Sequence, residues 1–286
     1  MRRAGGIAIV LVAFTGCGDS DHAGFNHESD LRPALLVASR FDAATSGTIT
    51  GQVRWNGAIP NIPPIAVERF NADGTKIEHV KRPNQHAPKI DADGHFANAV
   101  LYLRRIDCTR AKPWDHPPVT IEMHDEQPMV RQGNGPRGLV GFVHRGDAIT
   151  LVSKQPLFHA LRARGAHFFT LMLPDPDKPR RRVLIDGGHV ELSSGSGQAA
   201  MRGHLFVDDH PYYALTNSEG RFSLTEVPAG NYELICWYPD WRIDRWEHDP
   251  ETMLHVRLYF KPPVEIALSV HVKHGETSNV VVELQN

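Results

Sequence analysis

The chain has 286 residues, of which 41% are hydrophobic and 22% charged, a balance typical of a folded protein with room for two or three domains. Its 31 Lys and Arg nearly balance its 33 Asp and Glu, so the formal charge is −2. No large positive field is available to attract nucleic acid, and we expect no nucleic-acid partner. The 24 Gly and 21 Pro indicate many turns and few long helices. These features together predict an all-β fold.

Residues 1–16 have the pattern of a secretory signal peptide, with a charged start, a short apolar run and small residues before Cys17. The apolar run is too short for a comfortable transmembrane helix. Phe14-Thr15-Gly16-Cys17 resembles the lipobox of bacterial lipoproteins, with Phe14 where Leu is usual. The resemblance implies a lipid anchor on Cys17 and an extracytoplasmic location, in the periplasm or at the cell surface. The alternative is a secreted protein in which this Cys has no such role.

Residues 17–46 are mostly small and polar, which predicts a flexible tether without a core. Three strand-rich blocks follow, at residues 47–107, 117–208 and 209–286. Each contains short runs in which apolar and polar residues alternate, such as Ile49, Val53 and Trp55 in the first block. Short strands at this spacing predict tandem β-sandwich modules.

The third block contains two strand patterns joined by turn residues. Thr216-Asn-Ser-Glu-Gly-Arg-Phe-Ser-Leu224 is followed by Val227-Pro-Ala-Gly-Asn-Tyr-Glu-Leu234. This pattern resembles that of carboxypeptidase regulatory-like domains, which are small prealbumin-type β-sandwiches, with Asn217 where Asp is usual. The resemblance implies a structural or binding module without catalytic residues, and we expect no enzyme.

The second block resembles the cupredoxin-like domain found before a regulatory-like domain in secreted bacterial proteins of the methylamine-utilization type. His159 stands where the upstream copper-binding His is expected, and Met201 stands at the axial position. The Cys position falls near Gly195 and the second His position near Gln198, so two strong ligands are missing. The resemblance therefore implies a cupredoxin scaffold whose metal site is lost, and we expect no cofactor.

A copper-binding or electron-transfer protein with a non-standard site is the alternative function. Its candidate ligands are His159, Met201, His204 and His210. Strand alternation places residues 204, 208 and 210 on one face if the strand continues that far. The competing interpretation is a strand-to-turn corner in which Asp209 and His210 form local hydrogen bonds.

Aromatic and charged residues are concentrated near residue 240, where flat rings beside charged groups suit sugar stacking or a protein interface. The predicted ligand-binding surface comprises Trp237, Trp241, Trp246, Tyr212, Tyr213, Arg242 and Arg245. The alternative is that these rings pack on their sheet and the charges form a solvated ion-pair network. Cys108 and Cys236 either form one disulfide or remain two separate thiols, and the sequence leaves both possibilities open.

The sequence thus predicts a non-catalytic binding or surface-assembly lipoprotein, held to a membrane by its lipid anchor. The C-terminal module is expected to present its surface to a glycan or an envelope protein.

Overall fold

A computed structural model describes residues 40–70, 75–124, 127–251 and 254–285. Cys17 and nearly all of the predicted tether lie outside these residues. The regular secondary structure of the described chain consists of strands, apart from one short 3-10 helix, η1 (Ala43–Thr45). No helix in the described part is both long and apolar enough to span a bilayer. The all-β prediction is confirmed, and the strands form two β-sandwiches.

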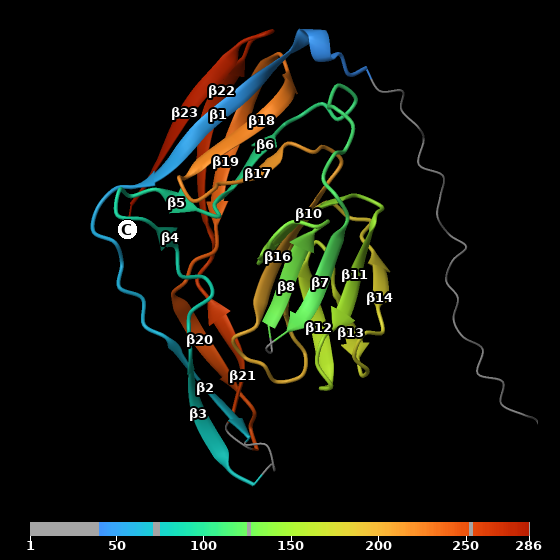
Figure 1. Ribbon diagram of the computed structural model, residues 1–286, viewed down its shortest axis with the longest axis vertical. Helices are drawn as coiled ribbons and strands as arrows, with labels where there is room; N and C mark the ends of the chain where they lie inside the picture. The colour runs from blue at the N-terminus through green and yellow to red at the C-terminus, as the bar shows by residue number, and fades with distance from the viewer. Residues whose placement is uncertain (1–39, 71–74, 125–126, 252–253, 286) are drawn as a thin grey trace, which may run out of the picture. The chain divides into compact units, whose positions relative to one another are not determined.

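The first sandwich pairs a three-stranded sheet, in the order β18-β1-β23, with a four-stranded sheet, in the order β17-β6-β19-β22. Its strands are β1 (Ser46–Trp55), β6 (Val100–Arg104), β17 (Tyr213–Leu215), β18 (Arg221–Pro228), β19 (Gly230–Tyr238), β22 (Val264–Val272) and β23 (Thr277–Leu284). Strand β1 runs antiparallel to β18 and parallel to β23, and Figure 1 shows it between them. Alternate apolar side chains from both sheets, including Ile49, Leu101, Leu234 and Val282, fill the core.

The blocks at 47–107 and 209–286 therefore share one core instead of forming two successive domains. Strands β1 and β6 come from the first block, and each pairs with strands from the third. Alternation along a strand shows which side chains face inward, but it does not show which strand is the neighbour. The sequence consequently indicated the strands of this sandwich without revealing that they share a core.

The second sandwich is inserted between β6 and β17, and all of its strands lie within residues 117–208. Its sheets have the orders β10-β16-β15-β12-β13 and β14-β11-β7-β8-β9. The strands are β7 (Val119–His124), β8 (Gln127–Gln132), β9 (Arg137–Gly138), β10 (Val140–His144), β11 (Ala148–Ser153), β12 (His159–Gly165), β13 (Phe169–Leu173), β14 (Arg180–Val183), β15 (Gly188–Ser194) and β16 (Arg202–Asp208). It has its own apolar core, which includes Ile121, Leu151, Leu161 and Leu205.

Three short hairpins complete the described strands. They pair β2 (Ile65–Phe70) with β3 (Ile77–Arg82), β4 (Lys89–Ile90) with β5 (Phe96–Ala97), and β20 (Ile243–His248) with β21 (His255–Phe260). Leu258 of β21 packs in one apolar cluster with Ala199, and its amide donates to the Ala199 carbonyl at 3.2 Å. The β20-β21 hairpin thus covers the loop between β15 and β16.

The turn between β17 and β18 has the geometry that its sequence predicts. The side-chain oxygen of Asn217 accepts hydrogen bonds from the amides of Glu219 and Arg221, at 3.0 and 2.8 Å. Gly220 has φ +69°, and an added Cβ would lie 2.4 Å from the Val53 carbonyl oxygen. Asparagine forms this side-chain turn as aspartate does, and glycine alone fits the close approach.

Candidate binding site between the two sandwiches

The predicted aromatic surface does not exist as one exposed face. Trp237 is 1% exposed, and Tyr212 and Tyr213 are also buried in apolar cores. The Tyr212 hydroxyl donates to the Glu226 carbonyl at 2.8 Å, and the Tyr213 hydroxyl donates to Asp208 at 2.7 Å. Because these hydroxyls find partners inside the protein, the rings are stable core residues.

The other four members of that predicted surface lie on or just before the β20-β21 hairpin. Trp241 and Trp246 are half-buried, while Arg242 and Arg245 are exposed. The Arg242 guanidinium forms hydrogen bonds with Asp240, and Arg245 lies 3.8 Å from the centre of the Tyr259 ring. These charges are therefore engaged locally, as the solvated-network interpretation expected.

The residues at the predicted copper positions do not form a blue-copper ligand set. His159 begins β12 and is fully buried, and Met201 lies in the apolar core of the second sandwich. The loop from Gly195 to Met201 carries hydroxyl and amide groups: Gln198 Oε1 accepts from Ser196 in the loop and from Ser194 at the end of β15. A blue-copper centre needs a thiolate and a second imidazole at this loop, and the loop supplies neither.

The two cysteines of the described chain cannot replace the missing thiolate. Cys108 is exposed, Cys236 is buried in the core of the first sandwich, and both are free thiols. Burial raises the pKa of the Cys236 thiol to about 12, so it stays protonated and unreactive at neutral pH. In the described chain the two thiols do not form the disulfide that the sequence left open.

His210 and His204 do not join His159 either. His210 accepts from the Tyr212 amide at 3.3 Å, and its Nε2 lies 3.4 Å from Asp208, so the corner is local as the sequence allowed. Its carboxylate is that of Asp208 and not that of Asp209, which pairs with Arg145 at 3.2 Å. Among the described residues, one group of three side chains that could bind a metal has its ligand atoms within 4.8 Å of one another. It comprises Asp91, Asp93 and His95. Asp91 accepts from the amides of Asp93 and His95, so this group is a hydrogen-bonded turn.

The two sandwiches meet at an aromatic interface. Phe142 and Phe206 of the second sandwich pack with side chains of β6, β17 and β19 in one buried cluster. The Trp237 ring meets Phe206 edge-on, with 5.1 Å between the ring centres, and it lies 4.9 Å from the His204 ring. Residues that the sequence placed on a ligand-binding surface therefore hold the two sandwiches together.

Three buried or half-buried imidazoles lie beside this interface, and we call His86, His189 and His204 the histidine cluster. Nε2 of His189 lies 3.1 Å from Nδ1 of His204. The His86 ring lies 5.5 Å from the His204 ring, centre to centre. Nε2 of His204 and both ring nitrogens of His86 are buried without a hydrogen-bond partner among the described residues. Such buried polar atoms need a ligand, an ordered water or another partner.

Burial keeps the histidine cluster neutral. It lowers the pKa of all three rings, that of His86 to about 3, and the nearby positive charge of Arg202 adds to the effect. Neutral imidazole has one N–H donor and one acceptor nitrogen. At neutral pH, His86 therefore offers both a donor and an acceptor.

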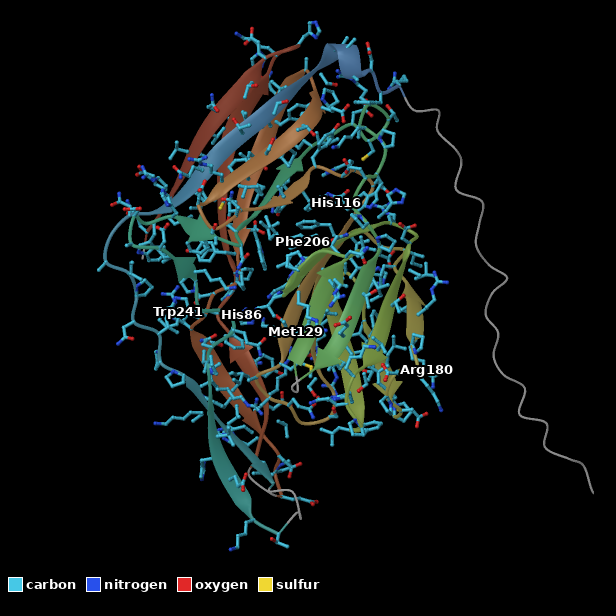
Figure 2. All side chains as sticks on the ribbon, viewed as in Figure 1. His86, His116, Met129, Arg180, Phe206 and Trp241 are labelled. Carbon is cyan, nitrogen blue, oxygen red and sulfur yellow. The ribbon has the colours of Figure 1, made fainter. Side chains whose placement is uncertain are left out.

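A cavity of about 600 Å³, the interface cavity, is lined by residues from both sandwiches and includes His86. Its wall combines apolar side chains, among them Phe96, Met129 and Leu139, with the polar groups of residues 84–86. Figure 2 labels His86 and Met129 in this region. A mostly apolar wall with a few polar groups is typical of small-molecule sites of this volume.

A second cavity, of about 460 Å³, is lined by His189, Phe206 and Trp237. Both positive and negative side chains line this second cavity. Two of them, Arg104 and Glu265, form an ion pair at 2.7 Å. The interface cavity is the larger of the two and has the more apolar wall, and it is the better candidate site.

Sequence reasoning missed the main residues of this site. His86 and Lys89 lie in or just after a proline-containing segment with no periodic pattern, and their cavity is completed by residues of the inserted sandwich. His204 was considered a candidate ligand, but its neighbour His189 was not. The one feature of the sequence that could have indicated this site is the run of three polar residues Asn84-Gln85-His86 before a short strand.

No family model and no curated protein matches this chain. Among solved structures, it is similar to a copper-containing nitrite reductase from Thermus scotoductus SA-01, with 16% identity over 34% of this chain and a TM-score of 0.26. The match spans 24% of the reductase, so most of that enzyme has no counterpart here.

The chain is also similar to variants of amicyanin. A reduced variant shows 14% identity over 32% of this chain and 81% of its own length, with a TM-score of 0.25. A Cu(I) variant shows 11% identity over 37% of this chain and 97% of its own length, also with a TM-score of 0.25. At these levels the likenesses concern backbone fold alone, and no residue role is transferred to this chain.

Proposed function

We propose that this protein is a non-catalytic binding protein on the extracytoplasmic side of a bacterial membrane, and that the interface cavity is its ligand site. The lipid on Cys17 would hold the chain at the membrane, and residues 17–39 would separate the sandwiches from it. The end of the predicted tether is folded instead, since the Arg40 amide donates to the Thr109 carbonyl at 2.7 Å and Ser46 begins β1. The lipobox-like sequence around Cys17 supports the anchor. A glycan or an envelope protein stays the predicted partner, and the interface cavity adds a small-molecule ligand to this proposal.

One observation carries the binding role: the interface cavity, of about 600 Å³, is large enough for a small organic molecule and has a mostly apolar wall to which both sandwiches contribute. A ligand that fills the apolar part of the cavity removes that surface from water, which stabilises the complex by roughly 25 cal/mol per Å² of apolar surface.

The test of this proposal is a cavity-filling substitution. Ala97 of β5 lines the cavity, and Ala97→Phe is expected to abolish saturable binding of decanoate or decanol, because the new ring occupies the space of the probe. Ala267→Phe is the matched control, since Ala267 is an exposed residue of β22 that does not line the cavity. Isothermal titration calorimetry on the full chain, below the micellar concentration of decanoate and the solubility limit of decanol, measures both.

The proposal is rejected if neither probe binds saturably, or if both bind equally well to the Ala97→Phe protein. Circular dichroism and the thermal midpoint of each variant establish that it is folded.

A further inference from the structure

We propose that one edge of the second sandwich docks on an anionic phospholipid bilayer, with exposed apolar side chains entering the headgroup region and arginines binding lipid phosphates. We call this surface, which comprises residues 157, 158 and 168–186, the β13-β14 edge. None of these residues lines the interface cavity, so the inference goes beyond the proposed ligand site and does not depend on it.

The outer strands of the two sheets lie together at this side of the sandwich. Strand β13 is the last strand of one sheet and β14 the last of the other, and Figure 1 shows them next to each other. The Arg182 guanidinium lies 5.3 Å from the centre of the Phe169 ring, and the Asp186 amide donates to Nε2 of His167 at 3.1 Å. The two strands therefore form one continuous surface.

This surface carries most of the large apolar side chains that are exposed in the described chain. Phe168 is 79% exposed and Ile185 59%, and both are next to the pair His167 and Asp186, so they lie at one corner. Six of the ten such side chains belong to the β13-β14 edge: Leu157, Phe158, Phe168, Met172, Val183 and Ile185. A concentration of exposed apolar groups is typical of a surface that contacts a protein or a membrane.

Three consecutive arginines, at positions 180–182, lie among these apolar residues. All three are exposed, and none has an ion-pair partner in the part of the chain that the structure describes. Figure 2 labels Arg180 at the margin of the second sandwich. Guanidinium groups bind phosphate oxygens through paired hydrogen bonds, so these arginines suit lipid headgroups.

Nearby acidic side chains do not cancel this positive charge. Asp175 pairs with Lys178 at 3.0 Å, and Asp177 pairs with Lys154 at 2.7 Å. Because each of these pairs is neutral, the three arginines are opposed by Asp186 alone within the β13-β14 edge. The edge thus keeps a net positive charge, although the formal charge of the whole chain is −2. An anionic bilayer attracts such a surface.

A bilayer accounts for both kinds of side chain better than a protein partner does. Charges on an edge strand prevent its pairing with another strand, but this protective role leaves the exposure of Phe168 unexplained. A second copy bound symmetrically through the same edge would bring two runs of arginines together, and like charges repel. The bilayer interface accepts apolar rings and supplies phosphates, and the lipid proposed on Cys17 would keep it within reach.

The experiment measures vesicle binding of the full chain carrying Cys17→Ser, which cannot be lipidated, so it does not depend on the proposed anchor. Flotation compares vesicles of phosphatidylcholine with vesicles of phosphatidylcholine and phosphatidylglycerol in equal amounts. Binding is expected to be stronger to the anionic vesicles. The combination of Arg180→Gln, Arg181→Gln and Arg182→Gln is expected to weaken that binding at least about tenfold, since each basic group at an anionic surface contributes about fivefold.

The matched control removes the same charge from exposed arginines elsewhere. Arg54→Gln, Arg110→Gln and Arg221→Gln together are expected to change binding less than about twofold, because charges beyond about 10 Å from the bilayer are screened by salt. Circular dichroism establishes that each variant is folded.

The apolar contact is tested by a second pair of substitutions. Phe168→Ser with Ile185→Ser is expected to weaken binding to the anionic vesicles at least about fivefold, because less apolar surface leaves water. Ile59→Ser with Val281→Ser, at exposed positions outside the edge, is expected to have less than about a twofold effect.

A photoreactive phosphatidylglycerol, cross-linked and mapped by mass spectrometry, locates the contact. We expect the cross-links in residues 157–186. The proposal is wrong if the anionic vesicles do not bind, if the arginine substitutions leave binding unchanged, or if the cross-links are confined to residues 1–39. If sedimentation instead shows a dimer that Phe168→Ser dissociates and no vesicles bind, the edge is a protein interface and the bilayer is excluded as its partner.

Discussion

Replacing Trp237 by alanine is expected to lower the free energy of unfolding by about 3–5 kcal/mol, the range for large aromatic residues in well-packed cores. Trp237 is among the largest fully buried side chains of the protein. Its ring contacts Phe206, His189 and His204, so the substitution leaves a cavity where the two sandwiches meet.

Trp241→Ala provides the control for the loss of an indole ring. Trp241 is half-buried and lies outside the interface cluster, so we expect its substitution to cost about 1 kcal/mol or less. Guanidinium denaturation followed by circular dichroism measures both variants. Equal costs for the two would contradict the packing role assigned to Trp237.

The stability of the protein is expected to fall as the pH drops from 6.5 towards 5, through proton uptake linked to unfolding. His86 and His204 are buried and neutral, with folded-state pKa values below the ordinary value of 6.5, that of His86 at about 3. Below pH 6.5 the unfolded chain protonates these rings and the folded chain does not. Their contribution is therefore complete above pH 6.5 and is lost as the pH falls towards the folded-state pKa values.

Each of these histidines contributes a slope of up to about 1.4 kcal/mol per pH unit in this window. The charged groups that act on the histidine cluster are Arg202, Glu191 and Glu265. Denaturation at several pH values between 5 and 7 measures the slope. His86→Gln is expected to reduce it, and His271→Gln, at an exposed ring, is expected to leave it unchanged. A slope that His86→Gln does not change would show that His86 is not the group that takes up the proton.

Local structure was more predictable than the neighbours of each element. The alternation of Ile49, Val53 and Trp55 correctly predicted a strand, and Asn217 and Gly220 correctly predicted a turn. Both depend on interactions that are close in the sequence. The pairing of β1 with β23 depends on residues from opposite ends of the described chain, so no local pattern reveals it.

The candidate site was harder to predict for the same reason. Trp237, Tyr212 and Tyr213 have the composition of a binding surface, but the inserted sandwich covers part of the sheet that carries Trp237. His86 contacts His204 of that sandwich, and only the folded chain brings the two together. The missing thiolate at the copper loop, by contrast, was predictable, because it depends on which residues the loop contains.

The measurement that tests the interface cavity most directly is a map of backbone amide chemical-shift changes when decanoate is added to the isotope-labelled full chain. We predict that the largest changes occur in residues 84–98 and 136–140, on both sides of the cavity, and that Ala97→Phe removes them. Changes concentrated instead around Trp241 and Arg245 would place the ligand on the hairpin and contradict the assignment of the interface cavity.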